Sequence, residues 1–174
     1  MKHICIIGGT GMLAEVTKWY ADNNSIVSVI ARNEEKMNRM KSACSHPENI
    51  KEIYVDYRDS TKFYQSLKQN IKEYGSLVEA VVWLHADGLE ALPILFDLME
   101  GKSKVWQVIG SKANSELLRK QYGTTKSIKY NHIQLGCMKD NNQQRWLTNL
   151  EIATGVIRSI QSDCSYNLVG ELSG

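Results

Sequence analysis

The feature that most constrains this chain is a short apolar run that passes directly into a glycine-rich turn. Ile4-Cys5-Ile6-Ile7 has the length of a buried strand, and Gly8-Gly9-Thr10-Gly11 follows it. The apolar residues after the turn recur at helical spacing: Met12, Leu13, Val16 and Tyr20. A strand, a glycine turn and a helix in this order aim the first amides of the helix at the space above the turn. This arrangement favours binding of a phosphate group.

The glycines follow the pattern G-x-x-G-x-x-A, with Gly8, Gly11 and Ala14 at the fixed positions. In this pattern Gly8 permits a tight turn, Gly11 permits close approach of a pyrophosphate, and Ala14 permits close packing of helix on strand. Glycine turns of α/β domains that bind nothing share the spacing. The position directly after the first strand favours a dinucleotide site.

The composition is that of a globular protein. With 174 residues, 43 % hydrophobic and 23 % charged, we expect one domain spanning residues 1–174. The net charge of +2 argues against a dedicated nucleic-acid surface. No run of 18 apolar residues indicates a membrane span, and the apolar start is too short for a signal peptide.

The cysteines and histidines show no ligand spacing. No two cysteines form a C-x-x-C pair, so we interpret them as free thiols in a reducing, cytoplasmic compartment. The histidines are scattered, and no metal site is expected. The residues are Cys5, Cys44, Cys137, Cys164, His3, His46, His85 and His132.

The rest of the chain alternates strands and helices. Apolar runs predict strands at 26–30, 52–55, 78–84, 105–109 and 128–135, and 166–169 is a candidate for a last one. Helical spacing predicts helices at 37–44, 60–74, 92–99, 115–122 and 150–160. Asp59 or Ser60 can cap the helix at 60–74, and Thr148 with Glu151 forms a capping box.

This alternation predicts the α/β class: a doubly wound, Rossmann-like parallel sheet of about six to seven strands with helices on both faces. Residues 4–7, 78–84 and 105–109 are expected in its centre. Ligands of such sheets bind outside the carboxyl ends of the strands, so the loops there are the candidate site.

Those loops resemble the short-chain dehydrogenase/reductase superfamily, nearest its extended and atypical branches. Ile7–Ala14 is similar to the family turn T-G-A-T-G-F-I-G. Val29–Lys36 resembles the second strand and its basic continuation, and Ile128–Gly136 resembles the sixth-strand I-R-V-N-x-I-x-P-G, with Leu135 in place of proline. The resemblance covers residues 4 to 138. It implies an oxidoreductase that uses a nicotinamide dinucleotide and acts on a small carbonyl or hydroxyl compound.

The resemblance also implies a set of cofactor-binding residues: Gly8, Thr10, Gly11, Met12, Leu13, Arg32, Asn33, Asp56, Tyr57, Ala86 and Gly110. Asp56 matches the family acid that binds the adenine amino group. A binder of NAD needs an acid after the second strand, where this chain has Arg32 and Asn33. An arginine there can pair with the 2′-phosphate of NADP, so NADP is favoured over NAD. The alternative is an exposed arginine that only opens a helix.

Four residues are candidates for catalysis. Gly110-Ser111 matches the strand end that carries the family's serine, which orients the substrate carbonyl. Tyr122-Gly123-Thr124-Thr125-Lys126 is a literal Y-x-x-x-K, the family's tyrosine–lysine motif. Family members place that motif on a long helix, whereas here it reads as a loop entering a strand. His85 could contact the ribose or act as an acid, or only bond a neighbouring loop. Cys137 is a redox candidate or an inert apolar residue.

Two functions stay open. One is an NADP-dependent oxidoreductase acting on an unidentified small molecule, and the other is an inactive dinucleotide-binding module that serves as a redox sensor or a protein-interaction scaffold. Residues 139–144 are read as a polar loop, and only the segment 136–147 could cover the pocket. Because the helix at 115–122 is short, we expect any oligomer to avoid the usual four-helix interface of the family.

Overall fold

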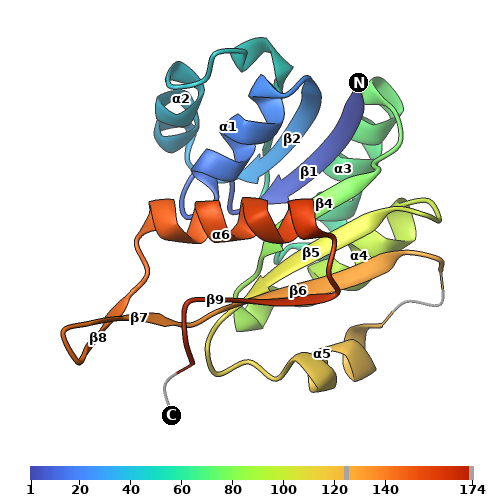
Figure 1. Ribbon diagram of the computed structural model, residues 1–174. Helices are drawn as coiled ribbons and strands as arrows, with labels where there is room; N and C mark the ends of the chain where they lie inside the picture. Colours follow the sequence, from blue (N-terminus) through green and yellow to red (C-terminus); the bar gives the residue numbers. More distant parts are fainter. Residues whose placement is uncertain (124–125, 173–174) are drawn as a thin grey trace.

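The computed structural model describes residues 1–123 and 126–172, whose strands form one parallel sheet of seven and a separate hairpin. Figure 1 shows the sheet, with strand order β3-β2-β1-β4-β5-β6-β9. The strands are β1 (Lys2–Ile7), β2 (Ser25–Ala31), β3 (Ile50–Tyr54), β4 (Glu79–Trp83), β5 (Lys104–Ile109), β6 (Lys129–Leu135) and β9 (Tyr166–Val169). Neighbouring strands all pair in parallel, and Ile4 of β1 lies opposite Glu79 of β4. The prediction of a doubly wound parallel sheet is confirmed.

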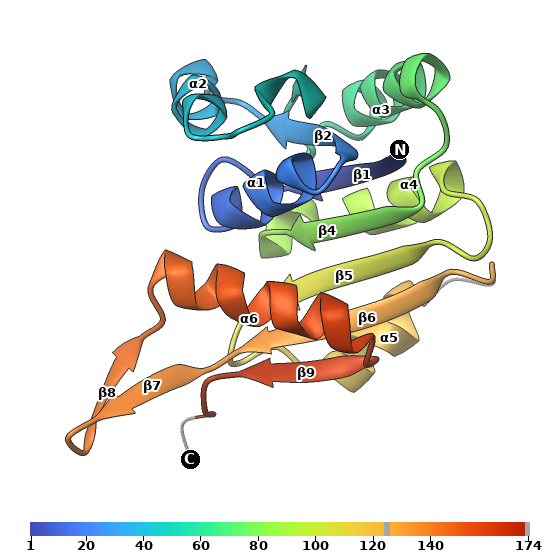
Figure 2. The same ribbon diagram turned by 45° about the horizontal axis from the view of Figure 1, so that its top comes forward.

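Helices cover both faces of the sheet (Figures 1 and 2). One face packs against α1 (Ala14–Asp22), α2 (Glu34–Ser42) and α6 (Asn149–Ser162). The other packs against α3 (Ser60–Tyr74), α4 (Ala91–Leu98) and α5 (Ser115–Tyr122). Single 3₁₀ turns, η1 (Pro47–Asn49) and η2 (Ala86–Gly88), lie before β3 and after β4. None of the helices in the described ranges is long and apolar enough to cross a membrane.

The central strand β1 shows why its sequence is apolar throughout. Ile4 and Ile6 face the core under α1 and α6, whereas Cys5 and Ile7 face the core under α3 and α4. All four are at most 1 % exposed, as expected for a parallel strand covered on both faces. Burying each of the isoleucines stabilises the fold by about 1.5–3 kcal/mol.

Local signals set the helix ends where the sequence predicts them. The Asp59 side chain accepts a hydrogen bond from the Lys62 amide at the start of α3. Thr148 and Glu151 form the predicted capping box of α6. Gly75, with φ of +99°, ends α3 in a conformation that favours glycine.

The segment after β6 differs from the predicted polar loop. Residues 137–146 form a hairpin of β7 (Cys137–Asp140) and β8 (Gln143–Trp146), which projects from the carboxyl end of β6 (Figure 1). Asn141 and Asn142 connect the strands with φ of +49° and +65°, which is the geometry of a type I′ turn. The apolar residues of the two strands lie only at Cys137, Met138 and Trp146, so no hydrophobic period marks the strands. The Asn-Asn pair is the signal that marks the turn.

Candidate functional site

The glycine turn after β1 uses its glycines for three different purposes. Gly8 has a φ of +94°, which an L side chain rarely adopts. A Cβ at Gly9 would lie 2.5 Å from Oγ1 of Thr17, so Gly9 allows the turn to pack on α1. A Cβ at Gly11 would meet no atom within 4 Å, because Gly11 faces open space. Ala14 packs, partly buried, against the core, and Gly9 adds a close contact with α1.

Two amides of the turn are left without a backbone partner in the described part of the chain. The carbonyl of Gly8 accepts hydrogen bonds from the amides of Gly11 (3.3 Å) and Leu13 (3.1 Å). The amides of Thr10 and Met12 make no backbone hydrogen bond within the described residues. These amides, at the start of α1, suit a phosphate group. Leu13 itself is fully buried in the core and does not line the cavity.

A cavity of about 860 Å³ extends from this turn along the carboxyl ends of β2, β3 and β4. Eight of the residues predicted for the site line it: Gly8, Thr10, Gly11, Met12, Arg32, Asn33, Tyr57 and His85. Leu13, Asp56, Ala86 and Gly110 do not line it. Lys36, Arg58, Trp83 and Asp87 line it without having been predicted.

The cavity is cationic where β2 and β3 end, because Arg32, Lys36 and Arg58 all line it. Arg32 is about two-thirds exposed, and its Nη1 lies 3.5 Å from Oδ2 of Asp56. The side chain of Asn33 accepts a hydrogen bond from the Lys36 amide and caps α2. Arg32 therefore lies directly before the N-cap of α2, where its guanidinium can reach an anion.

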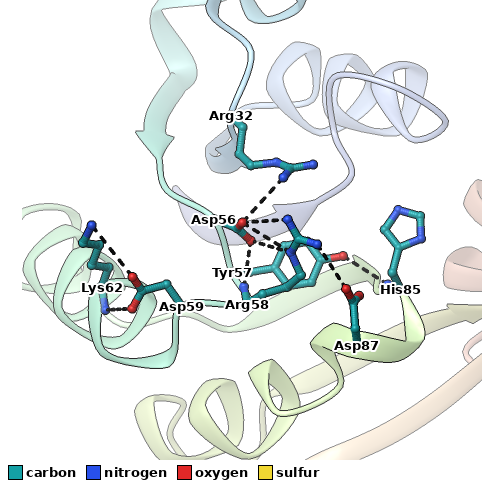
Figure 3. A network of polar contacts seen from close by, with 8 residues as sticks. All are labelled: Arg32, Asp56, Tyr57, Arg58, Asp59, Lys62, His85 and Asp87. Atoms are coloured by element: carbon teal, nitrogen blue, oxygen red, sulfur yellow. Dashed lines mark hydrogen bonds and ion pairs between the residues drawn. The ribbon is translucent and has the colours of Figure 1, made fainter.

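Asp56 is occupied by the neighbouring Arg58, as Figure 3 shows. The Arg58 side chain donates to both carboxylate oxygens, with Nε–Oδ1 of 3.0 Å and Nη2–Oδ2 of 2.9 Å. These bonds, together with the Arg58 amide, lower the pKa of Asp56 to about 2. Arg58 also donates through Nη1 to Oδ2 of Asp87 at 3.1 Å. Asp56 therefore binds an arginine, and it does not line the cavity.

The sequence signal for Arg58 lies in its position two residues after Asp56, in the loop at a strand end. Lys36 follows from its place in the first turn of a helix that opens at the same edge. The sequence did not indicate Trp83 as a site residue, because the whole apolar run at 78–84 predicts a buried strand.

Trp83 stands at the end of β4, between β1 and β5. Its Cβ lies 3.3 Å from the position of a Gly8 Cβ, and its Cη2 lies 4.0 Å from that of a Gly110 Cβ. The indole thus spans from the glycine turn to the end of β5. It forms an aromatic wall of the cavity on the side of β5.

Ser111 follows β5 and lines a second, smaller cavity of about 220 Å³. Gly136, Cys137 and the β8 residues Gln144, Arg145 and Trp146 complete this cavity. The side chain of Gln134 donates to the carbonyls of Gly110 (3.2 Å), Ser111 (3.4 Å) and Ala113 (2.9 Å). Gln134 thus holds the loop that positions Ser111, and Gly110 serves as an anchor of that loop.

Tyr122 and Lys126 lie at the opposite edge of the sheet from both cavities. Tyr122 ends α5, and Lys126 precedes β6, which begins at Lys129. Lys126 donates to the carbonyls of Phe96, Asp97 and Met99 at 2.8–3.2 Å, at the end of α4. The length of β6 places the amino ends of the strands roughly 20 Å from their carboxyl ends. The structure therefore does not bring this pair to the site, because the motif lies on the return path to β6; Thr124 and Thr125 lie outside the described residues.

The described residues hold no group of three or more histidine, cysteine, aspartate or glutamate side chains that could bind a metal ion. The four cysteines are present as thiols, and burial raises the pKa of Cys5 to about 12. Cys137 donates to the carbonyl of Glu171.

The fold is that of a doubly wound α/β protein, and its larger cavity lies at the carboxyl ends of the strands, where such proteins bind ligands. No protein-family profile matches the sequence, and no curated protein matches it. Solved short-chain dehydrogenase/reductases share the fold. One from Serratia marcescens BCRC 10948 has a TM-score of 0.73 at 14 % identity, covering 98 % of this chain and 97 % of that chain.

Two further structures agree with this similarity. A short-chain dehydrogenase/reductase described as a glucose/ribitol dehydrogenase, from Brucella melitensis, has a TM-score of 0.74 at 10 % identity, covering 97 % of this chain and 94 % of that chain. A short chain dehydrogenase from Bacillus anthracis has a TM-score of 0.72 at 14 % identity over the same shares. At these identities the comparison establishes the fold. The chain has the Rossmann-type fold of the short-chain dehydrogenase/reductases, as its motifs predicted.

Proposed function

We propose that this protein binds NADP and acts as an oxidoreductase of the short-chain dehydrogenase/reductase type on a small carbonyl or hydroxyl compound. The observation that carries the proposal is the 860 Å³ cavity, which joins an amide-presenting glycine turn to cationic side chains at the ends of β2 and β3. A dinucleotide has this distribution of groups, with a pyrophosphate at its centre and an adenosine at one end. Such a ligand would have its pyrophosphate at Thr10 and Met12 and its nicotinamide toward Trp83.

Arg32 carries the preference for NADP in this proposal. No acidic residue stands at the end of β2 to accept from a ribose 2′-hydroxyl. The exposed guanidinium can instead form charge-assisted hydrogen bonds with a 2′-phosphate. Its contact with Asp56 is long, at 3.5 Å, so little is lost when it turns toward a ligand.

The substrate would occupy the smaller cavity between Ser111 and the β7–β8 hairpin. When bound, the nicotinamide supplies or accepts the hydride. The Ser111 hydroxyl, held in place by the Gln134 bonds to its loop, can hydrogen-bond the substrate oxygen. Trp146 is 79 % exposed and offers an aromatic surface to the rest of the substrate. His85 lines the larger cavity and is a candidate proton donor.

The position of Tyr122 and Lys126 favours a second candidate, a dinucleotide-binding module without turnover. In the family, a tyrosine and a lysine of this motif protonate the substrate. Here the motif supplies neither residue to the cavity. Such a module would report the cofactor state to a protein partner.

Calorimetric titration with NADPH and NADH tests the binding, and NADPH oxidation with a panel of aldehydes and ketones tests the activity. We expect micromolar-range or tighter NADPH binding and turnover that Ser111→Ala abolishes without weakening NADPH binding. Binding without turnover of any panel member supports the module. Absence of binding to either dinucleotide refutes both functions.

A further inference from the structure

The position of the adenine base follows from the order of the strands, if the proposed dinucleotide site is correct. The sheet runs β3-β2-β1, and the pyrophosphate turn follows β1. A dinucleotide that extends from this turn past the end of β2 brings its adenine to the end of β3. Val55, Tyr57 and Arg58 line the cavity there.

The carboxylate at this place is bound mainly by Arg58. Oδ1 of Asp56 accepts from the amide and Nε of Arg58, each at 3.0 Å. Oδ2 accepts from Nη2 of Arg58 at 2.9 Å and from Nη1 of Arg32 at 3.5 Å. A carboxylate offers about four lone-pair sites, of which three donors of Arg58 and the long contact with Arg32 take one each. Asp56 does not line the cavity, so an adenine amino group would reach it only at the position that Arg32 gives up when it turns toward a ligand.

Arg58 is the group that the base would meet instead. Its guanidinium is fixed through its edge by Asp56 and by Asp87, and its side chain is 41 % exposed and lines the cavity (Figure 3). Gly88 allows this arrangement, since a Cβ there would lie 3.2 Å from Cγ of Arg58 and 2.2 Å from the Tyr57 ring. A planar cation held by its edge leaves its faces for stacking on an aromatic ring.

We infer that the adenine ring stacks on the guanidinium face of Arg58, and that Asp56 and Asp87 are positioning residues that hold this guanidinium. The protein then recognises the flat face of the purine and not its 6-amino group. A dinucleotide with hypoxanthine in place of adenine keeps the ring face and lacks the amino group, so it distinguishes the two kinds of recognition.

The test is calorimetric titration of NADPH, NADH and the hypoxanthine analogue of NADPH into the full chain. We expect the wild type to bind NADPH and its hypoxanthine analogue within about threefold of one another. Arg58→Ala should weaken NADPH and NADH alike by about tenfold, the size of a partly exposed stacking contact. Arg58→Lys should lose as much, because lysine keeps the charge but not the plane. Lys62→Ala is the matched control: Lys62 is an exposed cation nearby that does not line the cavity, and its loss should change nothing.

Three outcomes would overturn the inference while leaving dinucleotide binding intact. A hypoxanthine analogue that binds more than tenfold weaker to the wild type shows that the amino group is read. A loss in Arg58→Ala that is confined to NADPH assigns Arg58 to the 2′-phosphate. Full affinity in Arg58→Lys shows that charge suffices. Failure of the wild type to bind any dinucleotide instead refutes the proposed function itself. The wild-type comparison needs no variant, so it stands even where a variant fails to fold.

Discussion

The hydroxyl of Tyr57 accepts a hydrogen bond from the backbone amide of His85 at 3.1 Å. Tyr57 follows β3 and His85 follows β4, and these strands are separated in the sheet by β2 and β1. Three strand spacings correspond to about 14 Å. The bond, together with the Arg58–Asp87 ion pair, therefore joins two loops across the ends of the intervening strands. The joined loops form one wall of the larger cavity.

Removing the Tyr57 hydroxyl should weaken the link between the two loops and leave the Tyr57 ring in place. Tyr57→Phe keeps the ring that packs on Gly88 and deletes the acceptor for the His85 amide. We expect the free energy of unfolding to fall by about 1 kcal/mol or less, the net worth of one hydrogen bond. Hydrogen exchange at the His85 amide should become faster. Tyr64→Phe is the control, because the Tyr64 hydroxyl makes no hydrogen bond among the described residues; equal effects of the two changes would contradict the assignment.

Substitutions at Gly8 and Gly11 should have different effects, one on stability and the other on binding. Gly8→Ala forces a side chain into a φ of +94° and against Trp83, so the melting temperature should fall by several degrees. Gly11→Ala adds a methyl group in open space and should leave the melting temperature within about a degree. The same methyl group lies where a pyrophosphate would approach, so NADPH binding should weaken. Thermal unfolding and calorimetry of both variants check this, and unchanged binding in Gly11→Ala would move the phosphate elsewhere.

The sequence predicted those parts of the molecule that depend on local pattern. The glycine turn, the order of strands and helices, and the caps at Asp59 and Thr148 are all fixed by residues near one another in the chain. The partnership of Asp56 with Arg58 was missed. Asp56 was a predicted site residue and Arg58 was not, and the orientation of Arg58 depends on Asp87, which lies in a different loop.

The hairpin and the Y-x-x-x-K match show the other limits of the sequence. In the hairpin the strands are held by backbone hydrogen bonds rather than by an apolar face, so no period marks them. The meaning of the match at Tyr122 and Lys126 depends on the helix around it. That helix ends at Tyr122, and the lysine instead donates to carbonyls at the end of α4.

Buried His132 should make the protein sensitive to mild acid. The side chain is fully buried in β6, where Nδ1 lies 2.6 Å from Oγ of Ser115, and Nε2 has no partner among the described residues. Burial, and to a smaller extent the positive charge of Arg119, lowers the pKa of His132 to about 4. The folded state therefore resists protonation that the unfolded chain accepts below about pH 6.5.

The sign of this effect sets the pH window. Between pH 6.5 and pH 4 the unfolded state binds more protons, so stability falls as the pH falls. His132 contributes about 3 kcal/mol to this fall by pH 4, at about 1.4 kcal/mol per pKa unit. Burial also lowers the pKa of His3, which acts in the same direction. Denaturant unfolding between pH 7 and pH 4 measures the total loss of unfolding free energy. Titration of the His132 ring by NMR gives the contribution of His132 alone. A His132 pKa at or above 6 would refute the prediction.

Arg32 should determine the choice of cofactor. Arg32→Ala should weaken NADPH binding by about 10- to 100-fold, because charge-assisted hydrogen bonds of an arginine to a partly exposed phosphate contribute roughly 1.5–3 kcal/mol. NADH lacks the 2′-phosphate, so its affinity should hardly change. The preference of the wild type for NADPH should shrink as salt is raised, since the guanidinium is exposed and its attraction is screened.

Arg39→Ala is the matched control for this change. Arg39 is an exposed arginine of the adjoining helix α2, paired with Glu35 at 3.4 Å, and it does not line the cavity. Arg39→Ala alters the net charge as Arg32→Ala does. Any loss of affinity common to both variants therefore reflects the overall charge of the protein and not a contact with the ligand. Equal losses for NADPH and NADH in Arg32→Ala alone would place Arg32 under the adenosine or in support of the loop. A loss for NADPH alone places it at the 2′-phosphate, the one group by which the two cofactors differ.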